Sequence, residues 1–95
     1  MPLSEQAVAA RLADLSGWAG DGSGIHKTYA FASFRDAMAF VNTMADAAEE
    51  MQHHPDIDVR YDKVTLRCVS HDVGGVTERD FRLARRAELA AGGPA

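Results

Sequence analysis

The chain has 95 residues, of which 46% are hydrophobic and 25% charged, and its formal net charge is −4 at pH 7. This length suits one globular domain over 1–95, and the composition excludes disordered and collagen-like chains. The acidic balance argues against nucleic acid as a partner. No apolar run approaches the roughly 18 residues of a membrane span and no signal-peptide pattern opens the chain, so we expect a cytoplasmic protein without a membrane partner. The single cysteine, Cys68, excludes an internal disulfide.

A short helix is predicted near the start of the chain. Ser4 is a candidate N-cap, because a serine side chain can accept a hydrogen bond from the first unpaired amides of a helix. The apolar residues that follow fall on one helical stripe, namely Val8, Leu12 and Leu15. Ser16–Gly17 is expected to end this helix.

A β-hairpin is predicted next. The glycine-rich stretch 20–24 favours a turn between a strand near Trp18 and a strand over 25–31. Side chains alternate between the two faces of a strand, so every second residue of the latter shares a face. The set predicted to pack inward is Ile25, Lys27, Tyr29 and Phe31.

From Ser33 onward the hydrophobic period becomes helical. Ser33 and Asp36 have the spacing of a capping box, which marks the start of a helix. The predicted inner stripe comprises Phe34, Ala37, Met38, Val41, Ala45 and Ala48. The helix must end by about His54, because the residue before Pro55 is disfavoured in the α region.

A second hairpin follows over 57–69. Apolar residues alternate with polar ones on both sides of a tight connection at Asp62–Lys63. The predicted apolar sets are Ile57, Val59 and Tyr61 in one strand, and Val64, Leu66 and Cys68 in the other. In this reading Tyr61 is ordinary strand packing and Cys68 is a small buried hydrophobe.

The last predicted element is a helix that Thr77 opens, with Asp80 as its capping-box partner, and that ends at Gly92–Gly93–Pro94. The order helix, two strands, helix, two strands, helix predicts an α+β fold. We expect a four-stranded antiparallel sheet with three helices packed on one face.

Candidate chemistry concentrates where the long helix runs into a strand, at His53-His54-Pro55. If the helix persists through His53, Glu49 lies on the same face and can orient that imidazole. The alternative is that two adjacent histidines at a helix end are simply solvated.

Other candidates have structural alternatives as well. His71 follows the fourth strand on the face opposite Val64, so it is expected to face a cleft or solvent. The capping box by itself explains Asp80. Glu49, His53 and His71 are all metal-ligand types, which leaves a metal-dependent hydrolase as a further alternative. However, the chain has no His-Glu-x-x-His or Cys-x-x-Cys motif, so we expect no metal.

The spaced set Glu49, His53-His54-Pro55, Tyr61, His71 and Asp80 resembles the signature of the pterin-4a-carbinolamine dehydratases. The likeness extends to Gly17-Trp18, to the strand Tyr29-Ala30-Phe31, and to Ser70-His71-Asp72 with Gly74-Gly75-Val76-Thr77. The departures are mild, such as Ser70 where threonine is commoner.

The resemblance implies an enzyme that removes water from a 4a-hydroxytetrahydropterin and gives a quinonoid dihydropterin, which a reductase recycles. It implies no cofactor, a small pterin substrate, and a homodimer or homotetramer. His53 and His71 are then the proton-transfer pair, and His54 orients the substrate; which of the pair is acid and which is base stays open. Asp80 and Glu49 would support these imidazoles, and Pro55 and Tyr61 would shape the pocket.

A different class of function is the main alternative. Some relatives of this family are protein-interaction modules, including a dimerisation cofactor of a transcription factor. Such a role would use helix and strand surfaces and would not need the histidines. The complete histidine set therefore favours an enzyme.

Overall fold

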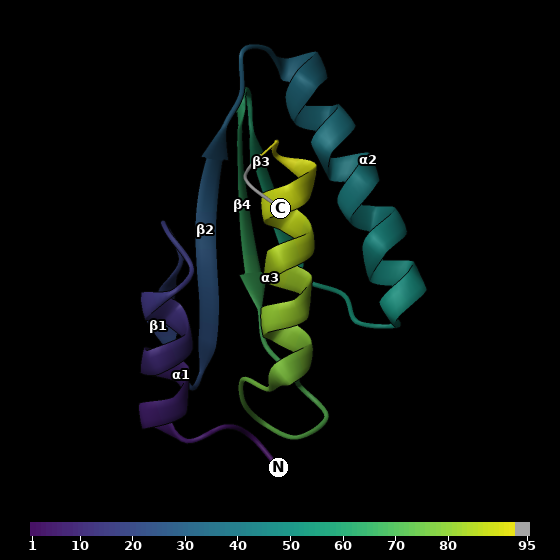
Figure 1. Cartoon of the computed structure of the whole chain (residues 1–95). Helices are drawn as coiled ribbons and strands as arrows, with labels where there is room; N and C mark the ends of the chain where they lie inside the picture. Colours follow the sequence, from purple (N-terminus) through teal and green to yellow (C-terminus); the bar gives the residue numbers. More distant parts are fainter. Residues whose placement is uncertain (93–95) are drawn as a thin grey trace.

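The computed structural model describes residues 1–92 and contains three helices and four strands (Figure 1). Their bounds are α1 Glu5–Ala13, β1 Ala19–Asp21, β2 Gly24–Ala30, α2 Phe34–Met51, β3 Asp56–Arg60, β4 Lys63–Cys68 and α3 Glu78–Ala90. All strand pairs are antiparallel, in the order β1-β2-β4-β3. The predicted α+β fold and element order are therefore confirmed.

The inner face of the sheet forms most of the hydrophobic core. Val64, Leu66 and Cys68 of β4 are fully buried, as their alternation predicts. In β2, Ile25 and Tyr29 are buried, whereas the intervening residues His26, Thr28 and Ala30 are exposed on the other face. The edge strand β3 is less covered, and its Ile57 is 37% exposed.

The buried face of α2 differs in part from the predicted stripe. Ala37 and Ala48 are buried as expected, but Phe34 is 50% exposed and Ala45 is also exposed. Phe40, Met44 and Ala47 are buried instead. This helix has apolar residues on two adjacent stripes, and packing against α3 and β4 buries the stripe that carries Phe40, Met44 and Ala47.

Helix α3 is anchored at both ends. At its start, Thr77 and Asp80 form a complete capping box. Towards its end, Glu88 Oε2 accepts hydrogen bonds from Lys27 Nζ at 2.8 Å and from Trp18 Nε1 at 3.2 Å, and also from the Tyr29 hydroxyl. Burial opposes the charge on Glu88, but these three hydrogen bonds lower its pKa below the ordinary value. The helix is thereby fixed against β2 and against Trp18, which directly precedes β1.

The end of α2 and the start of α3 lie side by side, and this brings together the two loops that adjoin them. The helices run in opposite directions, so the end of α2 lies beside the start of α3 (Figure 1). Helix α3 itself ends at Ala90 with Ala91 as its C-cap, close to the predicted stop. Gly93 and Pro94 lie outside the described residues. No helix among residues 1–92 has the length and apolar character of a membrane span.

Candidate active site

A pocket of about 380 Å³ opens where the end of α2 meets the loop between β4 and α3. Its lining residues are Gln52, His53, His54, Val69, His71, Asp72 and Arg79. The fold thus brings together three histidines that are up to 18 positions apart in the chain. Asp72 and Arg79, which are not among the predicted site residues, also border this space.

The two adjacent histidines are separated by the way α2 ends. Gln52 is the C-cap and adopts a left-handed conformation, with φ 53°. Its side-chain amide donates to the carbonyl of Glu49 at 2.8 Å, and the backbone amide of His53 donates to the carbonyl of Ala48 at 3.0 Å. The chain turns at this point, so that His53 is only 7% exposed whereas His54 lies at the surface.

Glu49 pairs with His54 Nε2 and not with His53. The expectation that Glu49 orients His53 is therefore wrong. It assumed a helix that continues through His53, whereas α2 stops at Met51. Both members of the observed pair are largely exposed, which makes it a solvent-screened contact at the rim of the pocket.

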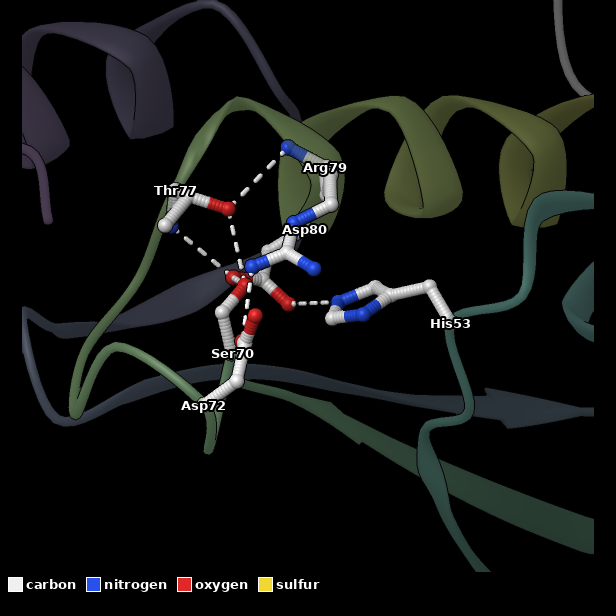
Figure 2. A network of polar contacts seen from close by, with 6 residues as sticks. All are labelled: His53, Ser70, Asp72, Thr77, Arg79 and Asp80. Carbon is white, nitrogen blue, oxygen red and sulfur yellow. Dashed lines mark hydrogen bonds and ion pairs between the residues drawn. The ribbon is translucent and has the colours of Figure 1, made fainter. Parts of the chain in front are cut away.

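His53 is instead paired with Asp80, from the first turn of α3 (Figure 2). The distance from Nε2 to Asp80 Oδ1 is 2.5 Å, and the carboxylate is fully buried. A carboxylate accepts hydrogen bonds, so we assign the proton to Nε2 and leave Nδ1 as the acceptor nitrogen of the ring. A buried carboxylate in this position stabilises the imidazolium that forms when Nδ1 takes a proton.

The second oxygen of Asp80 caps the start of α3. Oδ2 accepts the backbone amide of Thr77 at 2.9 Å and the hydroxyl of Ser70 at 2.8 Å (Figure 2). The hydroxyls of Ser70 and Thr77 are themselves 2.7 Å apart and form a further hydrogen bond. The capping of α3 and the orientation of His53 are therefore divided between the two oxygens of one carboxylate. Both interpretations of Asp80 from the sequence hold together.

An ion pair borders the pocket beside this network. Arg79 Nη2 donates to Asp72 Oδ1 at 2.7 Å. The hydrogen bond from Arg79 lowers the pKa of Asp72, and the same contact raises the pKa of Arg79. In the sequence, Asp72 belongs to the stretch Ser70-His71-Asp72 that carries part of the family resemblance, and Arg79 is marked only by its adjacency to Asp80. Nothing in the sequence separates Arg79 from the other arginines of the last helix.

Of the three remaining predicted site residues, His71, Pro55 and Tyr61, only His71 lines the pocket. His71 is exposed in the loop after β4 and faces the pocket, as its strand parity predicts. Pro55 directly precedes β3 and is half-buried, but it does not line the pocket. Tyr61 lies in the turn at the other end of β3, about 16 Å along the strand from the pocket side, and is 71% exposed. The expectation that Tyr61 shapes the pocket is therefore not met within the chain.

The metal alternative has no matching geometry in the part of the chain that the structure describes. No group of three or more histidine, cysteine, aspartate or glutamate side chains there is arranged to hold a metal ion. Glu49 contacts His54, while the imidazole of His53 is turned toward another carboxylate. The three candidate ligands, which include His71, do not converge.

Comparison with known proteins is consistent with this geometry. The family described as "Pterin 4 alpha carbinolamine dehydratase" matches residues 1–90. A relative from Thermomicrobium roseum, named provisionally as a dehydratase of this kind, is 49% identical over 90 residues, which cover 94% of this chain and 97% of that protein. A relative of the same provisional name from Sulfolobus acidocaldarius is 40% identical and covers 90% and 94% of the two chains.

Two solved structures are also similar. The crystal structure of a "transcriptional coactivator/pterin dehydratase" from Brucella melitensis has a TM-score of 0.91 and 31% identity, and covers 97% of this chain and 100% of its own. A pterin dehydratase-like protein described as a RuBisCO assembly factor of the α-carboxysome has a TM-score of 0.68 at 24% identity, with 81% and 89% covered, and so shows the fold alone. The family match over residues 1–90 and the identities of 40–49% assign this chain to the pterin-4a-carbinolamine dehydratase family.

Proposed function

We propose that this chain is a hydro-lyase that removes water from a 4a-hydroxytetrahydropterin and forms a quinonoid dihydropterin. The observation that carries the proposal is that the imidazoles of His53 and His71 border one pocket, and that a buried carboxylate holds the first of them. Family membership supports the substrate class. The reaction is an elimination without net oxidation, so the proposal requires no cofactor. A reductase would consume the product.

The elimination needs two proton transfers. The bond from C4a to oxygen breaks as a proton reaches the leaving oxygen, and the proton on N5 leaves as the C4a–N5 double bond forms. Imidazoles suit both steps because they ordinarily titrate near neutral pH. In the proposal, His53 Nδ1 accepts the proton from N5, and Asp80 stabilises the resulting imidazolium. His71 is exposed to water, delivers a proton to the oxygen and is reprotonated by solvent.

Other residues have positioning roles in this proposal. His54 lines the pocket, and its Nε2 is bound by the Glu49 carboxylate, so its Nδ1 is placed to accept a hydrogen bond from the pterin ring. Pro55 fixes the chain directly after this histidine. Asp80 is a positioning residue, because it acts through His53 and is itself fully buried.

The proposal is tested by following the dehydration of freshly generated 4a-hydroxytetrahydropterin spectroscopically. We expect the wild type to accelerate water loss, and His53→Ala and His71→Ala each to reduce the rate by about 10²- to 10⁴-fold. His26→Ala is the matched control, because this histidine is exposed on the sheet face that the helices do not cover. A wild type without activity, or a His71→Ala variant as active as His26→Ala, would contradict the proposal.

A second role on the same fold is the alternative outcome. The Brucella relative is described both as a coactivator and as a pterin dehydratase. A role limited to protein binding would tolerate His53→Ala and His71→Ala, provided that both variants stay folded. Retention of a partner-dependent function together with absent dehydratase activity would select this alternative.

We also propose that the chain assembles as a homodimer or homotetramer. Among residues 1–92 the edge strand β3 pairs with β4 alone, and apolar side chains are exposed at Phe34, at the start of α2 (50%), and at Ile57 of β3 (37%). Such apolar side chains are candidates for contacts between copies. Sedimentation equilibrium tests this directly, and a monomer at micromolar concentration would contradict it.

A further inference from the structure

Positive charge is concentrated on α3, next to the histidine pocket. Four of the chain's ten lysine and arginine residues lie in one eight-residue stretch of this helix, 79–86, although the net charge of the chain is −4. These residues are Arg79, Arg82, Arg85 and Arg86. Arg79 is bound to Asp72, and Arg86 donates to Glu50 at 3.0 Å. Within residues 1–92, neither Arg82 nor Arg85 forms an ion pair, and both are exposed.

The two unpaired arginines border a second hollow, of about 300 Å³. Its lining residues are Met51, Arg82, Arg85 and Arg86. The hollow adjoins the histidine pocket on both sides. Met51 directly precedes Gln52, which lines the pocket, and Arg82 lies one turn, about 4.5 Å along the axis, beyond Arg79. The two hollows are therefore neighbours between the end of α2 and the start of α3, and we refer to them together as the groove.

The charge in this groove is not balanced. The nearby carboxylates of Asp72 and Glu50 are each already bound by an arginine. The carboxylate of Glu49 is bound by His54. Arg82 and Arg85 therefore have no ion-pair partner among the described residues, and both line the hollow beside the apolar side chain of Met51. Guanidinium groups bind phosphate and carboxylate through paired N–H donors, whereas a neutral hydroxylated chain offers no charge to them.

We infer that the pterin substrate of this protein carries an anionic side chain, a phosphate or a carboxylate, which extends from the histidine pocket and is bound by Arg82 and Arg85. This inference rests on the proposed function for the position of the pterin ring. A nucleic acid is a poor fit to the same site, because two arginines of the groove lack an ion pair among the described residues and the chain as a whole is acidic.

Binding of unreactive pterins tests the inference without turnover. The probes are 6-hydroxymethylpterin and its monophosphate ester, titrated by quenching of pterin fluorescence at low ionic strength. We expect the phosphate ester to bind about tenfold more tightly than the neutral pterin. This advantage should disappear at about 0.5 M salt, because exposed charges are then screened.

A pair of double variants separates a local site from overall charge. Arg82→Gln/Arg85→Gln should remove the preference for the phosphate ester and leave affinity for the neutral pterin unchanged. Arg35→Gln/Arg60→Gln alters the net charge equally at two exposed arginines outside the groove, and should keep the preference. Equal affinity of the wild type for the two probes, or equal loss of preference in both double variants, overturns the inference.

The outcomes also distinguish this inference from the proposed function. A wild type that prefers the phosphate ester but fails to dehydrate any 4a-hydroxytetrahydropterin supports the anion site and refutes the dehydratase. A wild type that dehydrates the neutral substrate but shows no preference between the probes refutes the anion site alone. Failure to bind either probe refutes the anion site, and it refutes the dehydratase as well only if the wild type also fails to dehydrate the 4a-hydroxytetrahydropterin.

Discussion

The buried pair of His53 and Asp80 makes one substitution especially informative, Asp80→Asn. An asparagine has nearly the shape of an aspartate, so the site keeps its volume. Its side chain, however, has one acceptor oxygen where the carboxylate has two. The carboxylate currently accepts three hydrogen bonds, from His53 Nε2, from the Ser70 hydroxyl and from the amide of Thr77.

The substitution acts on both stability and chemistry. If the asparagine oxygen continues to cap α3, its NH₂ group faces Nε2 and donates to it. The proton of His53 then moves to Nδ1, and the ring can no longer accept a proton from the substrate. We expect the dehydration rate to fall about 10²- to 10³-fold. Loss of the charge-assisted hydrogen bonds should lower the free energy of unfolding by about 1–3 kcal/mol.

Urea unfolding and the dehydration assay, run on the same preparation, separate these effects. The matched control is Asp36→Asn, because Asp36 occupies the corresponding first-turn position of α2, is exposed and contacts no imidazole. The control should retain full activity, with a small loss of stability from the helix dipole. A folded Asp80→Asn protein within threefold of the wild-type rate would refute the role of this carboxylate in proton transfer.

Three further substitutions or measurements address other parts of the molecule. Glu88→Gln should lower the free energy of unfolding by about 2 kcal/mol at neutral pH, since the charged contact with Lys27 is lost. The pKa of Glu88 is lowered in the folded state, so its contribution is present above the ordinary value and is lost as the pH falls through the folded value. The difference between variant and wild type in urea unfolding should therefore shrink in acid, and a constant difference would contradict this. Glu49→Gln should raise KM about threefold with little change in kcat, because the exposed contact with His54 positions substrate, and a fall in kcat alone would oppose that role. Burial raises the pKa of Cys68 to about 12, so a thiol reagent should modify the native protein about 100-fold more slowly than the urea-unfolded chain, and rapid native labelling would show that the thiol is accessible.

Local sequence signals predicted most of the fold. The alternation in 64–68 identifies the buried face of β4. Side chains of a strand alternate between its two faces, so the face that carries the apolar residues must be the one that packs inward. Thr77 and Asp80 likewise locate the start of α3, since a capping box joins residues only three positions apart. These signals depend on neighbours in the chain and need no knowledge of tertiary contacts.

Features that depend on tertiary packing were not predictable in the same way. The inner side of α2 is selected by contact with α3 and β4, and the sequence offers two adjacent apolar stripes. The end of this helix is set by Gln52 in a left-handed conformation, and glutamine is not a residue that marks such a position. Because the chain leaves the helix at Gln52, before His53, each of the two histidines has a different partner from the one expected for a longer helix. Glu49 meets His54, and His53 becomes available to a carboxylate 27 positions away.

The position of the proposed base therefore depends on how α3 begins as well as on how α2 ends. Asp80 cannot move without releasing the amide of Thr77 and the hydroxyl of Ser70, both of which bind its second oxygen. This fixes the first oxygen, and with it the plane and the proton of His53. An orienting carboxylate on a free loop would have to be ordered each time the imidazole takes a proton, whereas here folding has already ordered it. The same coupling means that a loss of stability alone says nothing about chemistry at Asp80, so a loss of rate in a folded Asp80→Asn protein is the result that bears on the mechanism.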